Sequence, residues 1–166
     1  MKKFIIHLLS YAILFLVLLF AILFISGRAA KPQTFSANGL SITLTEDFEN
    51  SGYSSYSAAY ASDDVFAVTL KEDFVYFEAL PASLTEYAEI LRDANNLDAD
   101  ITENDGLVYY TYDIYDIDTQ ELYRIFYVFV YQTDDAFWSV QFAVNADANE
   151  KQRENIFTYA KSVCFE

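Results

Sequence analysis

One stretch of the sequence, ELYRIFYVFVYQ at residues 121–132, is apolar on both faces of an extended strand. Successive strand side chains alternate between two faces, so a strand of this kind has to be covered on both sides. One face carries Leu122, Phe126, Val128 and Val130, and the other carries Tyr123, Ile125, Tyr127, Phe129 and Tyr131. We therefore predict that it is the central strand of a β-sheet, with one packed layer above it and another below.

Shorter runs of alternating apolar and polar residues predict the other strands. They lie at residues 40–45, 56–61, 65–71, 99–103, 107–115 and 137–144. Asp105 and Gly106 precede one of these runs and are typical of a two-residue type I′ hairpin turn, which needs a positive φ at both positions. Residues 72–80 fit either a continuation of the third strand or an ordered loop.

Two further segments have apolar residues at helical spacing. The first begins at Ser83, and Glu86 three residues later completes the sequence of a capping box. The second closes the chain, with Asp147 as its predicted N-cap. Its predicted buried face consists of Ile156, Phe157, Ala160, Val163 and Cys164.

The order of these elements predicts the fold class. Three strands, a helix, four strands and a final helix follow one another, and short turns join most of the strands. Few helices and many short connections indicate an antiparallel sheet with the helices packed onto it. We predict an α+β domain at residues 39–166, with the sheet flanked by helices in an α/β/α sandwich.

The start of the chain has a different character. Residues 4–26 form an uncharged apolar run that, at about 1.5 Å per residue in a helix, is long enough to cross a bilayer. The run is longer than the apolar region of a cleaved signal, although cleavage stays an alternative. We predict a transmembrane anchor at residues 4–26 after a cytoplasmic tail at residues 1–3. A polar tether at residues 27–38 would then lead to a domain outside the cytoplasm.

Charge is divided unevenly along the chain. All 25 Asp and Glu residues lie after residue 31, where only six Lys and Arg residues occur, so this part carries 6 − 25 = −19. Nucleic-acid binding needs clustered basic residues and is excluded as a function. An acidic surface of this kind either attracts cations and basic partners or keeps an exported domain soluble.

Several kinds of catalytic and metal site lack the residues that they need. His7, inside the apolar run, is the only histidine, so Ser-His-Asp and Cys-His catalysis and histidine-containing zinc sites are excluded from the rest of the chain. Cys164 is the only cysteine and is predicted to be a small buried hydrophobic residue, with a reactive thiol or an intermolecular disulfide as alternatives. No glycine-rich phosphate-binding loop is present. We predict no catalytic residue and no cofactor.

Two acidic stretches are the candidates for a metal site. The first contains Asp113, Asp116, Asp118 and Glu121, and the second contains Asp98, Asp100, Glu103 and Asp105. Oxygen-rich loops suit Ca²⁺, which takes six to eight oxygen ligands. Neither stretch has the glycine spacing of an EF-hand loop, and acidic turns are common in a chain this acidic. The first stretch is the weak candidate for Ca²⁺.

The elements together resemble a known superfamily. The segments that carry the resemblance are NGLSITLTEDF (38–48), VFAVTLKEDF (65–74), SLTEYAEILRDANNL (83–97), DGLVYYTYDI (105–114), FWSVQFAV (137–144) and the closing helix. In element order they resemble the PsbP-like α/β/α sandwich, and above all its membrane-anchored bacterial domains of unknown function. Members of that superfamily include photosystem accessory subunits and a Ran-binding import factor, so the resemblance implies a fold and no single activity.

These observations predict a membrane-tethered, non-enzymatic domain outside the cytoplasm. Its expected partners are the lipid bilayer, through residues 4–26, and a protein of the cell envelope, with a Gram-positive bacterium as the expected source. The alternative is a surface domain that binds a small ligand or Ca²⁺, and an enzyme is the third hypothesis.

Overall fold

The computed structural model describes residues 30–52 and 55–166. The chain divides into two units, Met1–Lys31 and Pro32–Glu166, and the fold below is that of the second unit. The predicted cytoplasmic tail and membrane anchor at residues 1–26 lie outside the described residues. Within the described residues, no helix is long and apolar enough to cross a membrane.

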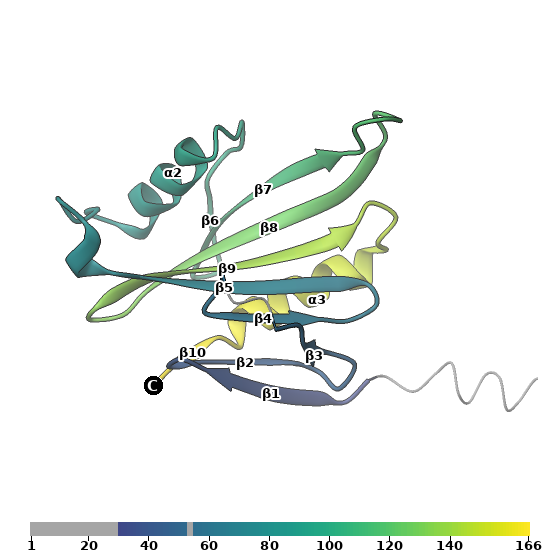
Figure 1. Ribbon diagram of the computed structural model, residues 1–166, viewed down its shortest axis with the longest axis horizontal. Coiled ribbons are helices and arrows are strands. Elements are labelled where there is room, and N and C mark those ends of the chain that lie inside the picture. The colour runs from purple at the N-terminus through teal and green to yellow at the C-terminus, as the bar shows by residue number, and fades with distance from the viewer. Residues whose placement is uncertain (1–29, 53–54) are drawn as a thin grey trace, which may run out of the picture. The chain divides into compact units, whose positions relative to one another are not determined.

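The larger sheet has seven antiparallel strands (Figure 1). They are β3 (Glu49–Asn50), β4 (Ala58–Ala61), β5 (Val65–Asp73), β6 (Thr102–Asn104), β7 (Leu107–Tyr115), β8 (Leu122–Gln132) and β9 (Ala136–Asn145). Their order across the sheet is β3-β4-β5-β9-β8-β7-β6. β8, the predicted central strand, is therefore an inner strand beside the middle one, which is β9.

A second, three-stranded sheet contains β1 (Pro32–Ala37), β2 (Leu40–Thr45) and β10 (Cys164–Phe165), in the order β1-β2-β10. Asn38 and Gly39, at φ 53° and 88°, make the tight turn that pairs β1 with β2. The prediction that residues 27–38 are only a tether is wrong for residues 32–37, which form a strand. The polar sequence of β1 concealed it, because this strand lies at a sheet edge and needs few apolar residues.

The helices are α2 (Leu84–Ala94) and α3 (Glu150–Lys161), and a short 3₁₀ turn, η1 (Phe74–Tyr76), follows β5. Residues 72–80 thus contain the end of β5 and this turn. Ser83 caps α2 by accepting a hydrogen bond from the backbone N–H of Glu86, as predicted. The N-cap of α3 is Asn149 and not Asp147, and Asn149 and Gln152 form a reciprocal capping box.

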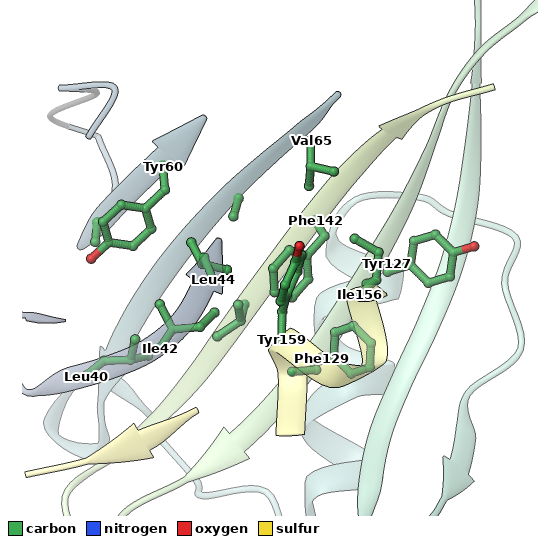
Figure 2. Packing of buried hydrophobic residues seen from close by; sticks show 14 of the residues in the cluster. Leu40, Ile42, Leu44, Tyr60, Val65, Tyr127, Phe129, Phe142, Ile156 and Tyr159 are labelled. Carbon is green, nitrogen blue, oxygen red and sulfur yellow. The ribbon is translucent and has the colours of Figure 1, made fainter. Parts of the chain in front are cut away.

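One face of the seven-stranded sheet is covered by α3 together with the small sheet. Leu40, Ile42 and Leu44 of β2 and Ile156 and Tyr159 of α3 are buried against it. Figure 2 shows Tyr127, Phe129 and Phe142 of the large sheet around Ile156 and Tyr159, with the three β2 side chains to the left. The hydroxyl of Tyr131 on β8 donates a hydrogen bond to the carbonyl of Ala160 on α3 at 2.8 Å, which ties the helix to the sheet.

The opposite face is covered by α2. Tyr87 of this helix is fully buried, and its ring stacks on that of Phe137 in β9, with 4.4 Å between centroids. The Tyr87 hydroxyl donates to the carboxylate of Glu72 at the end of β5. Both faces of β8 are therefore covered, and the predicted antiparallel α+β sandwich is confirmed.

Candidate functional site

The turn between β7 and β8 is held by one carboxylate. Oδ1 of Asp116 accepts hydrogen bonds from the backbone N–H groups of Asp118 (3.0 Å) and Thr119 (2.8 Å) and from the Thr119 hydroxyl (3.1 Å). The backbone of Asp116 also bonds to Glu121 and Gln120 across the turn. Aspartate favours such turns because its short side chain reaches the backbone two and three residues ahead. The loop therefore has a defined conformation although it is exposed.

These hydrogen bonds also set the charge of the turn. The backbone N–H of Thr119, then its hydroxyl, then the backbone N–H of Asp118 stabilise the ionised form and hold the pKa of Asp116 below its usual value. Asp116 is thus an anion at neutral pH, and its carboxylate stabilises the conformation of the loop. Asp113, Asp118 and Glu121 beside it are exposed.

A β-bulge alters the direction of β8 where it leaves this turn. Ile114 of β7 pairs with Arg124 and Tyr115 pairs with Leu122, so Tyr123 is an extra residue without a partner on β7. A bulge adds one residue to a strand, so the side chains before the bulge point to the opposite face from the one that strict alternation predicts. Leu122 consequently packs against the same core as Ile125, whereas strict alternation predicted that it would share a face with Phe126. Tyr123 is left 53% exposed.

An open hollow adjoins the bulge. It is lined by Leu122 and Tyr123 at the start of β8, by Asn145 at the end of β9, and by Ala146 and Asp147, which follow β9. The backbone N–H of Ala146 donates to the carbonyl of Tyr123 at 3.1 Å and holds the two segments together. The hollow combines an aromatic ring and aliphatic side chains with the exposed carboxylate of Asp147.

Large apolar side chains are exposed around the same turn. Ile114 is 40% exposed, Tyr115 54% and Ile117, at the tip, 89%. We use the name hairpin-end surface for Ile114, Tyr115, Ile117, Tyr123, the carboxylates at 113, 116, 118 and 121, and the lining of the hollow. Figure 1 shows this turn at the upper right, away from α2. It is the candidate functional site, because clustered exposed apolar residues mark interaction surfaces.

The predicted metal ligands lie on this surface, but their side chains are not arranged as a metal-binding site. Asp113, Asp116, Asp118 and Glu121 all belong to the hairpin, and one oxygen of Asp116 is occupied by the loop itself. Among the residues that the structure describes, no set of three or more His, Cys, Asp or Glu side chains is arranged to hold a metal ion. The Ca²⁺ hypothesis stays a prediction.

Two other candidates from the sequence have different surroundings. In the second acidic stretch, Asp105 forms an ion pair with Lys161 of α3, which lowers the pKa of this aspartate. Its turn has the predicted positive φ values, 54° at Asp105 and 77° at Gly106. Cys164 is exposed on β10, so the prediction of a buried position on the closing helix is wrong; that helix ends at Lys161, before the cysteine.

A second group of exposed apolar residues lies at the other end of the sheet. Val75, Tyr76 and Leu80 are 81%, 80% and 52% exposed in and after η1. The strand directions place them opposite the hairpin, because β5 begins at the hairpin end and runs away from it. Because these side chains are also apolar and highly exposed, this group is the internal reference for the hairpin-end surface.

The sequence predicts the carboxylates of the site but not its exposed apolar side chains. Ile117 stands between two aspartates in a turn, where an apolar residue has no structural use. This apolar residue in a polar turn is the feature of the sequence that indicates an exposed contact residue. The bulge at Tyr123 has no signal in the sequence, because the run at residues 121–132 is apolar on both faces and a shift of register leaves its pattern unchanged.

Comparison with known proteins gives the class of fold. The structure matches the solution structure of cyanobacterial PsbP (CyanoP) from Synechocystis sp. PCC 6803 with a TM-score of 0.54 and 15% identity, over 84% of this chain and 95% of that one. It also matches a crystal structure from Bacteroides thetaiotaomicron VPI-5482 with a TM-score of 0.53 and 12% identity, over 84% of this chain and 49% of that one. No protein-family model and no curated protein sequence matches.

These matches define a PsbP-like α+β sandwich. At such low identity the likeness concerns the fold alone, so no functional residue is transferred from either protein. The predicted resemblance is confirmed at the level of the fold.

Proposed function

We propose that this protein is a non-enzymatic accessory domain that binds a basic protein partner through the hairpin-end surface. In this proposal residues 4–26 anchor the chain in the cell membrane, the acidic domain lies outside the cytoplasm, and the partner belongs to the cell envelope. The observation that carries the proposal is the exposure of Ile117, Tyr115 and Tyr123 around an ordered, acidic turn.

The chemistry of the surface supports a basic partner. Asp113, Asp118 and Glu121 are exposed beside these apolar side chains, and the salt bridges that the described residues form lie elsewhere in the fold. A basic partner would be attracted over distance by the −19 charge and held by the apolar contacts after docking.

The lining of the hollow also fits a basic partner. Leu122 and Ala146 offer apolar contact, and Asp147 offers an exposed carboxylate. The ring of Tyr123 already has the guanidinium of Arg124 over it, 5.0 Å from the ring centroid, so this ring accepts a cation. A Lys or Arg side chain has this combination of properties, an apolar stem that ends in a positive charge. A hollow this open suits one protruding side chain of a partner better than it suits an enclosed small molecule.

Co-purification of the full-length chain from its native membranes tests the proposal. Ile117→Ser is expected to lower the yield of a stoichiometric partner by about fivefold or more, the effect of losing one interface hot spot. Val75→Ser, which removes an equally exposed apolar side chain at the opposite end, is expected to leave the yield unchanged. Equal yields from the two variants would contradict the proposal.

A further inference from the structure

Strand β1 is the only long edge of the two sheets within the described residues. The other edge strands, β3, β6 and β10, have two, three and two residues, whereas β1 has six. Proteins normally protect an edge of this length with charged residues, a bulge or an internal proline. β1 pairs with β2 without interruption, carries no charge, and has its proline only at its first position.

The outer side of β1 has backbone hydrogen-bonding groups that bond to no other residue in the described part of the chain. Both the N–H and the C=O of Thr43 on β2 bond to the Ser162 hydroxyl, on the side away from β1 (2.9 and 3.1 Å). Thr43 and its partner Thr34 are therefore a pair without mutual backbone hydrogen bonds. It follows that the N–H and C=O groups of Thr34, and of Ser36 two residues on, point outward from the sheet.

We propose that this edge pairs with β1 of a second copy of the chain. In an antiparallel pair centred on Phe35, Thr34 lies opposite Ser36 of the second copy and Ser36 lies opposite Thr34 of the second copy. The two pairs exchange four backbone hydrogen bonds, which uses all the outward groups of both residues. The arrangement is self-complementary and closes as a two-fold dimer.

The charge distribution permits a second copy at this edge. Two domains of −19 repel each other, yet residues 32–45, which form the whole β1–β2 hairpin, contain no charged residue. Phe35 supplies apolar contact as well. Its ring packs against Tyr60 at 5.1 Å and stays half-buried at the edge, and in the dimer it would meet Phe35 of the second copy.

The dimer is tested by sedimentation of the full-length chain in a mild detergent, with variants that carry charges of either sign on β1. The unaltered chain is expected to be in a monomer–dimer equilibrium. T34E/S36E places glutamates opposite one another and is expected to raise the dimer Kd at least tenfold, and T34K/S36K does the same with lysines. A mixture of the two double variants is expected to restore the dimer, because opposite charges then face each other.

The matched control is S41E/T43E, which adds the same charge at the positions paired with Ser36 and Thr34 but on the inner strand β2. Circular dichroism confirms that each variant is folded. The control is expected to keep the dimer. A chain that stays monomeric up to about 1 mM, a dimer that T34E/S36E leaves unchanged, or a mixture that fails to recover the dimer would each overturn the proposal.

Discussion

At the scale of single residues, Asp116 links the conformation of the hairpin to its charge. Its carboxylate accepts three hydrogen bonds within the loop, and the loop presents Ile117 to solvent. An apolar side chain at a disordered tip would lose conformational entropy on binding, whereas a loop that is already ordered loses less. Asp116 is therefore a positioning residue for the proposed contact.

Asp116→Ala is expected to loosen the loop and leave the sheet intact. Its effect would appear as a severalfold faster hydrogen exchange of the Thr119 amide, together with weaker partner binding. Asp118→Ala removes another carboxylate of the same loop, and this carboxylate accepts no hydrogen bond from the loop amides. The variant is therefore expected to leave the exchange rate of the Thr119 amide unchanged. Equal acceleration in the two variants would mean that charge alone, and not the hydrogen bonds of Asp116, orders the loop.

Acid should have the same effect as the alanine variant. The pKa of Asp116 is lowered in the folded protein, so the hydrogen bonds to its ionised form stabilise the loop fully above the unfolded value of about 3.9. This contribution is lost as the pH falls through the lower, folded pKa. NMR titration of the Thr119 amide is expected to show a midpoint below pH 3.9, and a midpoint above it would contradict the proposed role.

At the scale of elements, two tyrosines fasten the two helices to opposite faces of the sheet. Tyr87 of α2 donates to Glu72 of β5, and Tyr131 of β8 donates to the carbonyl of Ala160 in α3. Burial, and for Tyr87 also the nearby Glu72 carboxylate, raises the pKa of both hydroxyls, so both remain donors at any ordinary pH.

Tyr87→Phe is expected to lower the free energy of unfolding by about 1–2 kcal/mol and Tyr131→Phe by about 1 kcal/mol, because the first loses a charged acceptor. The two losses should add in the double variant, since the sites lie on opposite faces of the sheet. Urea denaturation measures them, with the exposed Tyr76→Phe as the unaffected control. A double variant much less stable than the sum would show that the two faces are coupled.

The same scale shows which elements the sequence could predict. Strands β7, β8 and β9 and helix α2 are predictable because their patterns are long and periodic and the sequence of the α2 cap is distinctive. β1 has the sequence of a polar tether because an exposed edge strand needs no apolar alternation. The predicted N-cap of α3, Asp147, lies two residues before the observed one, Asn149, because both residue types are good caps and the tertiary position of the helix selects between them.

The candidate site was predictable only in part for a related reason. Its carboxylates are visible in the sequence as a cluster, and its exposed Ile117 is visible as a misplaced apolar residue. The hollow depends on the contact between Ala146 and the bulged Tyr123, residues that are distant in sequence. No local pattern encodes a contact of that range.

At the scale of the whole molecule, the charge of −19 on residues 32–166 should govern how fast the partner binds. Raising ionic strength from about 0.01 M to 0.15 M shortens the Debye length from about 30 Å to 8 Å, so association should slow markedly while dissociation changes little. Surface plasmon resonance with the purified partner measures both rates. An association rate that does not depend on salt would indicate a partner selected by shape and apolar contact alone.

Site-specific photo-crosslinking of the full-length chain in native membranes tests the central claim most directly. A photoreactive residue at position 117 is expected to capture one dominant, basic protein in a saturable way, and the same residue at position 75, equally exposed at the opposite end, is expected not to capture it. Capture of that protein equally from both positions, or from position 75 alone, would contradict the assignment of function to the hairpin-end surface.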